Sequence, residues 1–346
     1  MHYPVSQKML ADHLGLSPAT VSLVMNRSPV ADAIPQSTKD RIFEAARKFN
    51  YRPNVMARSL RTQRSFTIGV IVPEVSEGYA ALVMSGIEDH LVREGYFYLV
   101  ASHHHKNDLI EEYPRVLLGR SVDGVIALDT LWSQELPVPL AVISGRVHVK
   151  GATNIVLDHE HAVEMALTHL YQLGHRRVAF IKGQSFSADT EIRWNAICRV
   201  AREIGLPVLP QLTVQLVGDS PSPEVGRSAT HRLLATNEPF TALFAFNDIS
   251  AIGAIRALRE AGRRVPEDVS VVGFDDIQSA AFQNPALTTV RQPLHRMGDV
   301  AAEMVLRQIA GGERLQRVKT ITVEPELIVR ESTALVRERQ KTKSRQ

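Results

Sequence analysis

The apolar positions between Val5 and Asn50 recur at helical spacing in three short blocks. These blocks are Met9-Leu10-Leu14, Val21-Val24-Met25 and Ile42-Phe43-Ala46-Phe49. Residues three and four apart share one face of an α-helix, so the pattern predicts three short amphipathic helices. Gly15 is suited to end the first helix, and Ser17-Pro18 to open the second as N-cap and first helical residue. Two helices joined so tightly predict a helix-turn-helix.

The second of these helices has side chains suited to a major groove. Val21 and Val24 are expected to face the core, which leaves small and hydroxyl side chains outside. Thr20, Ser22 and Asn26 can contact phosphates, whereas Pro18, Ala19 and Leu23 can meet base edges or thymine methyls. An ordinary helical hairpin is the alternative. The candidate DNA contacts here are Ser17, Pro18, Ala19, Thr20, Ser22, Leu23, Asn26 and Arg27.

Residues 54–61 follow Tyr51-Arg52-Pro53 and form a segment too short to be a stable helix on its own. We expect it to order only when it docks against a partner copy in the minor groove. Leu60 would then act as an apolar wedge between base pairs, with Arg58 and Arg61 near phosphates. The alternative is a plain basic linker. The candidate contacts in this hinge are Tyr51, Asn54, Ala57, Arg58 and Leu60.

From Phe66 onward, short apolar runs alternate with longer amphipathic stretches, a pattern typical of parallel strands connected by helices. The expected strands span residues 67–72, 97–101, 124–128, 140–143, 177–181, 212–216, 242–245 and 269–273. The expected helices span residues 79–94, 110–119, 161–173, 190–204, 223–235, 248–261 and 297–309. These elements suffice for two open α/β sheets, in which ligands bind beyond the carboxyl ends of the strands. Those positions hold Glu77 to Tyr79, His103, Asp129, Gln184, Asn247-Asp248 and Asp275-Asp276.

The charge of the chain is concentrated at its N-terminus. Residues 1–64 contain ten Lys and Arg against four Asp and Glu, a net charge of +6, whereas the whole chain carries +3. A polyanion-binding head needs such a local positive field, although a solvated basic face is the alternative. With 346 residues, 44% of them hydrophobic, the chain can form two or three folding units. No stretch is apolar enough for a membrane span or a signal peptide, so we expect a cytoplasmic protein without membrane contact.

Sequence motifs of common enzymes are absent. The chain has no GxSxG, GxxxxGK[ST], GxGxxG or HExxH motif, and its single cysteine, Cys198, excludes an intramolecular disulfide. His103-His104-His105 and His159-Glu160-His161 raise the alternative of a metal site, but adjacent side chains point in different directions. We therefore expect no enzymatic activity, no metal and no cofactor. Residues 337–346 form a basic tail without heptads, which does not favour a tetramerising coiled coil.

Over nearly its whole length the chain resembles the lactose-repressor/galactose-repressor family of bacterial transcription regulators. Residues 16–22 with Asn26 resemble the family's recognition helix, and Tyr51-Arg52-Pro53-Asn54 with residues 57–60 its hinge. Ile68-Gly69-Val70 resembles the opening strand of its body. Its later motifs are matched by residues 173–179, 246–248, 265–266, 271–276 and 285–290.

The resemblance implies an all-α helix-turn-helix head and an α/β body like a periplasmic binding protein, with two Rossmann-like subdomains. It implies a homodimer that binds double-stranded operator DNA and closes on a small effector. Tyr79, Asp158, Arg193 and Asp275 would line the effector cleft, with Phe246 and Asn247 beside it. The implied domains are residues 1–50 (head), 51–65 (hinge), 66–336 (effector-binding and dimerisation) and 337–346 (tail). Within the body, the N-subdomain spans about 66–160 and 292–322, and the C-subdomain about 161–291 and 323–336.

Three departures from the family pattern affect function. Pro18, Ala19 and Leu23 lack long polar side chains, so we expect operator specificity to depend on methyl contacts and on DNA deformation by Leu60. The loop of residues 26–38 is longer than usual. Ala196 replaces a common glycine, and Glu77-Gly78-Tyr79 departs from the usual cleft sequence, so a sugar effector is favoured but a nucleobase stays open. A sugar-binding protein without a regulatory role and a sugar-modifying enzyme are the alternatives to a repressor.

Overall fold

The computed structural model describes residues 5–26, 28–51, 64–75, 78–145, 147–219, 222–311 and 318–336. It forms two compact units, Met1–Ser65 and Phe66–Gln346. Several expectations fall outside the described residues. They concern the hinge, the basic tail, Glu77 and the candidate DNA contacts Arg27, Asn54, Ala57, Arg58 and Leu60.

The first unit is a small helical head, built from α1 (Gln7–Leu14), α2 (Pro18–Met25), the 3₁₀ helix η1 (Pro29–Ala33) and α3 (Gln36–Lys48). Gly15 ends α1 in the left-handed conformation with φ of 66°, and the Ser17 hydroxyl accepts a hydrogen bond from the Thr20 amide at the start of α2. Both predicted caps are therefore confirmed. The long loop after Asn26 contains η1, which adds Ala31 to the core. That core consists of Leu10, Ala11, Val21, Val24, Ala31, Ile42, Ala45 and Ala46.

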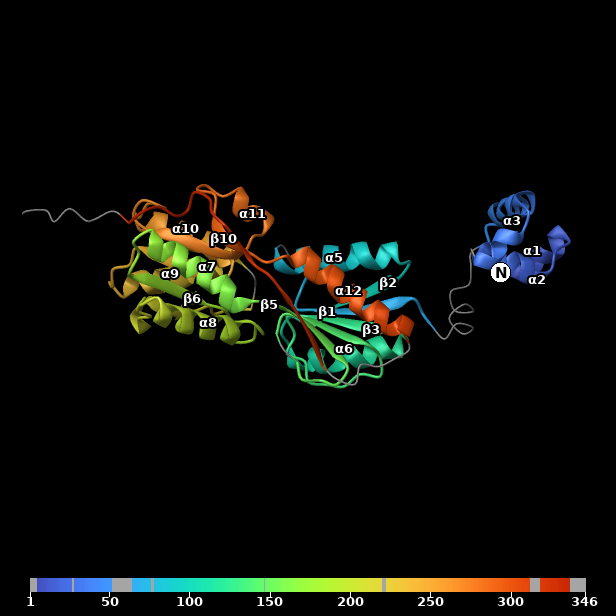
Figure 1. Ribbon diagram of the computed structural model, residues 1–346, viewed down its shortest axis with the longest axis horizontal. Helices are drawn as coiled ribbons and strands as arrows, with labels where there is room; N and C mark the ends of the chain where they lie inside the picture. The colour runs from blue at the N-terminus through green and yellow to red at the C-terminus, as the bar shows by residue number, and fades with distance from the viewer. Residues whose placement is uncertain are drawn as a thin grey trace, which may run out of the picture. The chain divides into compact units, whose positions relative to one another are not determined.

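The second unit begins with a lobe built on a six-stranded parallel sheet, hereafter the first lobe (Figure 1). The strand order is β11-β5-β4-β3-β1-β2. Helices α5 (Tyr79–Arg93) and α12 (Leu294–Gly311) cover one face, and α6 (Asn107–Gly119) packs on the other. The strands are β1 (Thr67–Val72), β2 (Phe97–Ser102), β3 (Gly124–Leu128), β4 (Leu140–Ile143), β5 (Ala152–Leu157) and β11 (Lys319–Val323).

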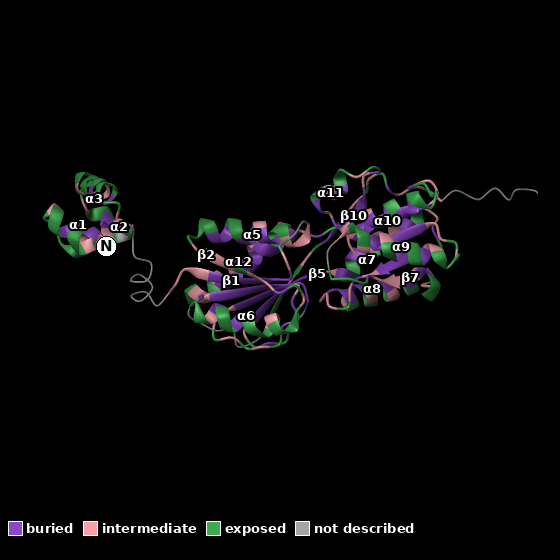
Figure 2. Ribbon diagram, turned by 180° about the vertical axis from the view of Figure 1, so that it is seen from behind, coloured by how far each residue is buried: buried purple, intermediate pink, exposed green. Residues whose placement is uncertain are grey.

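The second lobe repeats this plan with the strand order β12-β10-β9-β8-β6-β7. All its pairs are parallel except β10 with β12. Helices α7 (His159–Gln172) and α8 (Thr190–Glu203) cover one face, and α9 (Pro223–Ala235) and α10 (Asp248–Glu260) the other. The remaining elements are β6 (Val178–Lys182), η2 (Pro210–Leu212), β7 (Thr213–Gln215), β8 (Ala242–Ala245), β9 (Ser270–Asp275), α11 (Gln278–Ala281), β10 (Thr288–Arg291) and β12 (Glu326–Ile328). In both lobes the buried residues concentrate in the strands and the inner helix faces (Figure 2).

The chain passes from one lobe to the other at three places in the described residues. It crosses between β5 and α7, between β10 and α12, and between β11 and β12. Each connection is only a few residues long, so the crossings bring together elements far apart in sequence (Figure 1). Short connections of this kind absorb backbone rotation at a few residues, and they therefore permit the two lobes to hinge.

All eight expected strands and all seven expected body helices are present, with ends that differ by at most three residues. Four strands were not expected: β5, β10, β11 and β12. In β5 the apolar pattern is interrupted by Thr153 and Asn154, which are nevertheless buried. The Asn154 amide exchanges two hydrogen bonds with the backbone of Val147, at 3.2 and 3.0 Å, and this long-range pairing satisfies its polar atoms. β11 and β12 lie at sheet edges and have only weak apolar patterns.

Each lobe contains one helix pair that packs backbone to backbone through glycine. A Cβ atom on Gly86 of α5 would lie 1.9 Å from the carbonyl oxygen of His295 in α12. Gly298, one turn further along α12, also lies against α5. In the second lobe a Cβ on Gly253 of α10 would lie 1.8 Å from the carbonyl oxygen of Pro223. Only a residue without a side chain allows these approaches. The glycines thereby set the distance between helices that cover the sheet.

We expect Gly86→Ala to lower the free energy of unfolding by about 2 kcal/mol or more, because the new methyl group forces α5 and α12 apart. Urea denaturation measures the change. Gly119→Ala is the matched control, since a Cβ there meets nothing within 4 Å. The control should stay within about 0.5 kcal/mol of the parent chain. Equal stability of the two variants would contradict this account of the helix pair.

Candidate functional site: a cleft between two sheets

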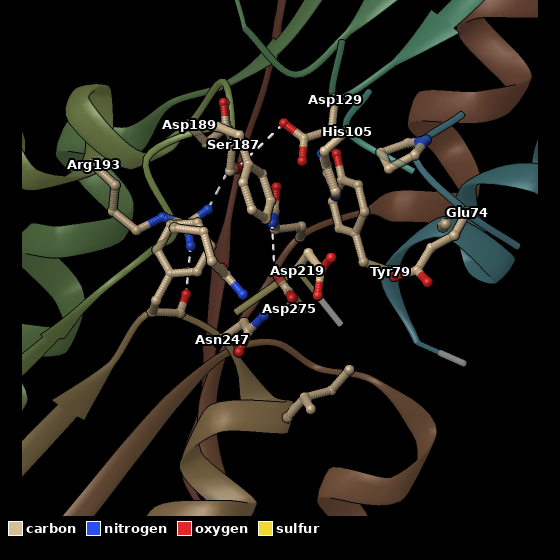
Figure 3. Close-up of a pocket in the computed structure, with 17 residues that line it drawn as sticks. Glu74, Tyr79, His105, Asp129, Ser187, Asp189, Arg193, Asp219, Asn247 and Asp275 are labelled. Atoms are coloured by element: carbon tan, nitrogen blue, oxygen red, sulfur yellow. Dashed lines mark hydrogen bonds and ion pairs between the residues drawn. The ribbon is translucent and has the colours of Figure 1, made fainter. Parts of the chain in front are cut away.

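The carboxyl ends of both sheets face a shared cavity of about 830 Å³, a volume that includes its opening to solvent (Figure 3). Residues from both lobes line it, and eleven of the 17 follow a strand by one to four positions. This is where open α/β sheets bind ligands. The lining residues are Pro73, Glu74, Tyr79, Ala80, His105, Asp129, Gln184, Phe186, Ser187, Asp189, Arg193, Asp219, Phe246, Asn247, Ile249, Asp275 and Gln292.

Arg193 is the one arginine or lysine among the lining residues, and its side chain is 4% exposed. Its guanidinium carbon lies 3.6 Å from the ring centroid of Phe274 and 4.4 Å from that of Phe246. Nη1 donates a hydrogen bond to the carbonyl oxygen of Phe246, and Nη2 lies 3.8 Å from Oδ2 of Asp189. Burial lowers the pKa of Arg193, although the neighbouring carboxylates raise it. The guanidinium thus lies between two aromatic rings, and the carboxylate of Asp189 partly balances its charge.

Asp189 precedes α8 and joins the two lobes. Its Oδ1 accepts a hydrogen bond from the amide of Gly145 in the first lobe at 3.1 Å and lies 3.3 Å from Nε2 of His159. Burial raises the pKa of Asp189, but His159, Arg193 and the Gly145 amide together lower it more, so the carboxyl stays ionised. A Cβ on Gly145 would lie 2.7 Å from the Cβ of Ala188, so the lobes touch here.

The carboxyls of Asp129, which is half-buried, and Asp275, which is buried, lack such strong compensation. Asp129 accepts hydrogen bonds from the Ala188 amide at 2.8 Å and the Ser187 hydroxyl at 3.2 Å. Burial raises its pKa to about 6, and the charge of Asp189 adds to the effect. Asp275 accepts a hydrogen bond from Nε2 of Gln292 at 2.6 Å, and burial raises its pKa to about 7. Perturbed carboxyls in a cleft are typical of binding sites.

Aromatic side chains form the remaining walls. The rings of His105 and Phe186 stack across the lobes with centroids 3.8 Å apart. Tyr79, at the start of α5, shares a short hydrogen bond with the Ser144 hydroxyl. Burial and the nearby carboxylates raise the pKa of Tyr79 well above its usual value, which keeps the phenol neutral. Flat apolar faces beside carboxylates suit a ring that carries polar groups.

The structure brings together five of the six expected effector residues: Tyr79, Arg193, Phe246, Asn247 and Asp275. Asp158 lies elsewhere. It is the N-cap of α7 and accepts a hydrogen bond from the His161 amide at 3.0 Å, so its carboxylate satisfies a helix terminus and does not line the cavity. Asp189, which was not expected, lines the cavity.

Among the loop positions after strands, Asp129 and Gln184 line the cavity, but three others do not. Asp248 is fully buried beneath it and accepts hydrogen bonds from the Ile277 amide and the Thr289 hydroxyl. Asp276 pairs with Arg291 and Arg330. His103 is buried against Thr130, and His105 lines the cavity instead. The positions selected after the strands did not include His105, Phe186 and Asp219, which also line the cavity.

In the head, the expected DNA contacts divide into two groups. Ser17, Pro18, Ala19 and Asn26 are exposed around α2, whereas Thr20, Ser22 and Leu23 are half-buried. Hydrogen bonds within the helix link Thr20 to Ser17 and Asn26 to Ser22. Leu23 and Tyr51 pack against the hydrophobic core of the head. These two side chains therefore already have apolar contacts within the protein.

Two further observations concern the described part of the chain. No group of three His, Cys, Asp or Glu side chains there is arranged to hold a metal ion. Likewise, no helix in that part combines the length and apolar character that crossing a membrane requires.

A helix-turn-helix head joined to a two-lobed body with a ligand cleft defines the class of ligand-controlled transcription regulators. Residues 10–54 match the bacterial regulatory proteins of the lacI family, and residues 167–333 match the periplasmic binding protein-like domain. The HTH-type transcriptional repressor PurR of Haemophilus influenzae (strain PittEE) is 30% identical over 335 residues, 94% of this chain and 97% of PurR. The chain belongs to the lacI family of bacterial regulatory proteins.

Two solved structures resemble the whole chain. The lac repressor dimer bound to operator and the anti-inducer ONPF has a TM-score of 0.80 at 23% identity, covering 96% of this chain and all of the other. This likeness establishes the shared fold. The complex of the transcriptional regulator CelR with cellobiose has a TM-score of 0.69 at 27% identity, covering 95% of this chain and 99% of that one. The protein is therefore a DNA-binding regulator, and neither a sugar-binding protein without a regulatory role nor a sugar-modifying enzyme.

We expect Asp275→Asn to change how stability depends on pH. The Asp275 carboxyl has a pKa of about 7 in the folded chain, against about 4 when unfolded. Between these values the folded state holds the proton and the unfolded state does not. The contribution of Asp275 to stability is therefore full below about pH 4, falls as the pH rises from about 4 to 7, and is lost above pH 7. From pH 5 to pH 8 the variant should gain on the order of 2 kcal/mol relative to the parent chain.

Urea denaturation of both proteins at the two pH values measures this gain. Glu112→Gln, at an exposed position of α6 outside the cavity, is the control and should follow the parent chain at both pH values. If Asp275→Asn also follows the parent, the carboxyl does not titrate in this range.

Proposed function

We propose that this protein represses transcription as a homodimer that binds a near-palindromic operator and is controlled by a small effector in the cleft. In this proposal residues 1–50 read the major groove, residues 51–65 form the hinge, and residues 66–336 bind effector and dimerise. The subdomains and the tail of residues 337–346 keep the bounds given above. The observation that carries the proposal is the pairing of a capped α2 with a cleft built from both lobes.

The exposed side chains at the start of α2 support direct contact with DNA. Ser17, Pro18 and Ala19 lie at the N-terminus of the helix, where backbone amides favour phosphate oxygens. Thr20, Ser22, Leu23 and Asn26 follow on the same helix or at its end. Because no long polar side chain is available on this face, we assign base recognition mainly to contacts with thymine methyl groups. Arg27, Asn54, Ala57, Arg58 and Leu60 complete the proposed DNA contacts, together with Tyr51.

Three contacts across the cleft supply a physical route for control. Asp129 binds the loop before α8, the Gly145 amide binds Asp189, and His105 stacks on Phe186. An effector that inserts between these groups favours one orientation of the lobes over another. Coupling of this kind is typically about 1–3 kcal/mol, or roughly 5–150-fold in operator affinity.

We favour a sugar or sugar derivative as the effector, bound by Tyr79, Arg193, Phe246, Asn247 and Asp275. Carboxylates and a guanidinium form charge-assisted hydrogen bonds with hydroxyl groups, and the aromatic walls suit a ring face. The CelR structure contains cellobiose, whereas the name PurR leaves a nucleobase open. We also propose a cytoplasmic location, which a DNA-binding role supports.

Selection of the purified full-length protein against random DNA duplexes at fixed salt tests the proposal. We expect an enriched near-palindrome, and log affinity should fall by about 0.9 per neutralised phosphate as log salt rises. Repeating the selection with sugars and nucleobases should reveal a compound that alters binding. Salt-sensitive binding without sequence preference would refute operator recognition.

We expect Leu60→Ala to remove discrimination between operators with different central base steps, because no side chain then unstacks them. Competition binding with two operators that differ only at the centre measures the ratio of affinities. The ratio should fall to about one, while binding to non-specific DNA stays within about threefold. Arg58→Ala is the matched comparison and should weaken all duplexes alike. Retained discrimination in Leu60→Ala would exclude the wedge.

A further inference from the structure

Hydrogen-bonding capacity inside the cavity is distributed unevenly between acceptors and donors. Asp129, Asp189, Asp219 and Asp275 contribute carboxylates, and Arg193 contributes the one guanidinium among the described lining residues. Asp189 interacts with His159, the Gly145 amide and Nη2 of Arg193. In the described part of the cavity wall, acidic side chains therefore outnumber basic ones. The cavity is a poor host for phosphorylated or acidic ligands, whose charge would add to the repulsion.

Three buried side-chain atoms in the described residues lack partners, and two of them, on Arg193 and Gln292, belong to cavity-lining side chains, whereas the third is Nδ1 of His159. Oε1 of Gln292, whose side chain donates to Asp275 through Nε2, accepts no hydrogen bond. Nε of Arg193 donates none. Gln292 and Arg193 are each 3% exposed. Because an unpaired buried polar atom is costly, such atoms in a cavity wall indicate what the ligand must supply.

The ligand must therefore bring donors to one region and an acceptor to another. Asp275 and Oε1 of Gln292 form a pair of acceptors in the second lobe, and Asp129 offers a further acceptor from the first lobe (Figure 3). An ammonium group has three donors and no acceptor, and it also neutralises carboxylates. A hydroxyl or ring oxygen would satisfy Nε of Arg193. Burial raises the pKa of Asp129 and of Asp275, although the charge of Arg193 acts in the opposite direction on both, and an ammonium would stabilise the ionised carboxylates further.

We propose that the effector is a small hydroxylated molecule that carries a protonated amine, the chemistry of an amino sugar. The ammonium lies between Asp275, Gln292 and Asp129, and an oxygen of the ligand accepts from Arg193. Aromatic faces of Tyr79 and Phe246 contact the carbon skeleton. This inference rests on the proposed function, since it names the ligand class of the same cleft.

Calorimetric titration of the full-length protein with matched compounds tests the inference. D-Glucosamine, D-galactosamine and D-mannosamine are each compared with the parent hexose, which differs only by a hydroxyl in place of the ammonium. Glucuronate and galacturonate supply the anionic counterparts. We expect at least one amino sugar to bind about tenfold or more tightly than its parent, because its hydrogen bonds to the carboxylates are charge-assisted. Parent sugars that bind as tightly, a uronate that binds, or no binding by any amino sugar would each overturn the proposal.

Variants locate the effect within the cavity. Asp275→Asn preserves the shape of the side chain but removes its charge, and its loss of affinity for the amino sugar should exceed its loss for the parent sugar by about tenfold or more. Glu112→Gln on α6 is the control and should change neither affinity. Equal losses for both sugars in Asp275→Asn would show that no ammonium lies there. The denaturation curves described above establish that the variant folds.

Operator selection without added ligand separates this inference from the proposed function. An enriched operator that no amino sugar affects would overturn the amine and leave the repressor standing. Binding of an amino sugar by a protein that selects no operator would overturn operator recognition and leave the assignment of the ligand class intact.

Discussion

The guanidinium of Arg193 has almost no contact with water, so the protein around it must satisfy its charge and its hydrogen-bond donors. Two aromatic rings cover its faces, a carbonyl oxygen accepts from Nη1, and Asp189 supplies opposite charge. Asp189 in turn binds His159 and reaches the other lobe through the Gly145 amide. Because an unpaired buried charge is very unfavourable, these groups constrain one another. The position of α8, the state of its neighbouring carboxyls and one contact between the lobes all follow from this arrangement.

The two lobes share one architecture. Each has a doubly wound sheet whose carboxyl strand ends face the cavity, and each is closed on one side by a helix pair in glycine contact. Rigid lobes joined by three short connections confine the available motion to the hinge between them. Control by an effector then requires only that it binds the two orientations with different affinity. The contacts of Asp129, Gly145 and His105 across the cleft are the groups that such a difference would act on.

Local physical rules were sufficient where the residues that decide a feature are close in sequence. The left-handed Gly15, the Ser17 cap and the eight expected strands follow from backbone conformation and short-range periodicity. The same rules failed for β5, where burial of Asn154 depends on a hydrogen-bonding partner that the strand pattern does not reveal. The resemblance to the family, in turn, assigned Asp158 to the cleft, where the structure does not place it, because a carboxylate before a helix is equally suited to capping and to ligand binding.

The sequence by itself determined the class of the protein, the helical head, the two α/β sheets and five of the six residues that we assigned to the cleft. Motif resemblance carried the assignment of those residues, whereas the rule of carboxyl strand ends pointed to Asp129 and Gln184. Tertiary structure alone decided that Asp189 joins Arg193, that His105 meets Phe186, and that an acceptor of Gln292 lies unpaired beside Asp275. The reason is physical: His105 and Phe186 come from different lobes, and the burial and charge balance of the other two pairs exist only once the strands and helices of the second lobe pack around them.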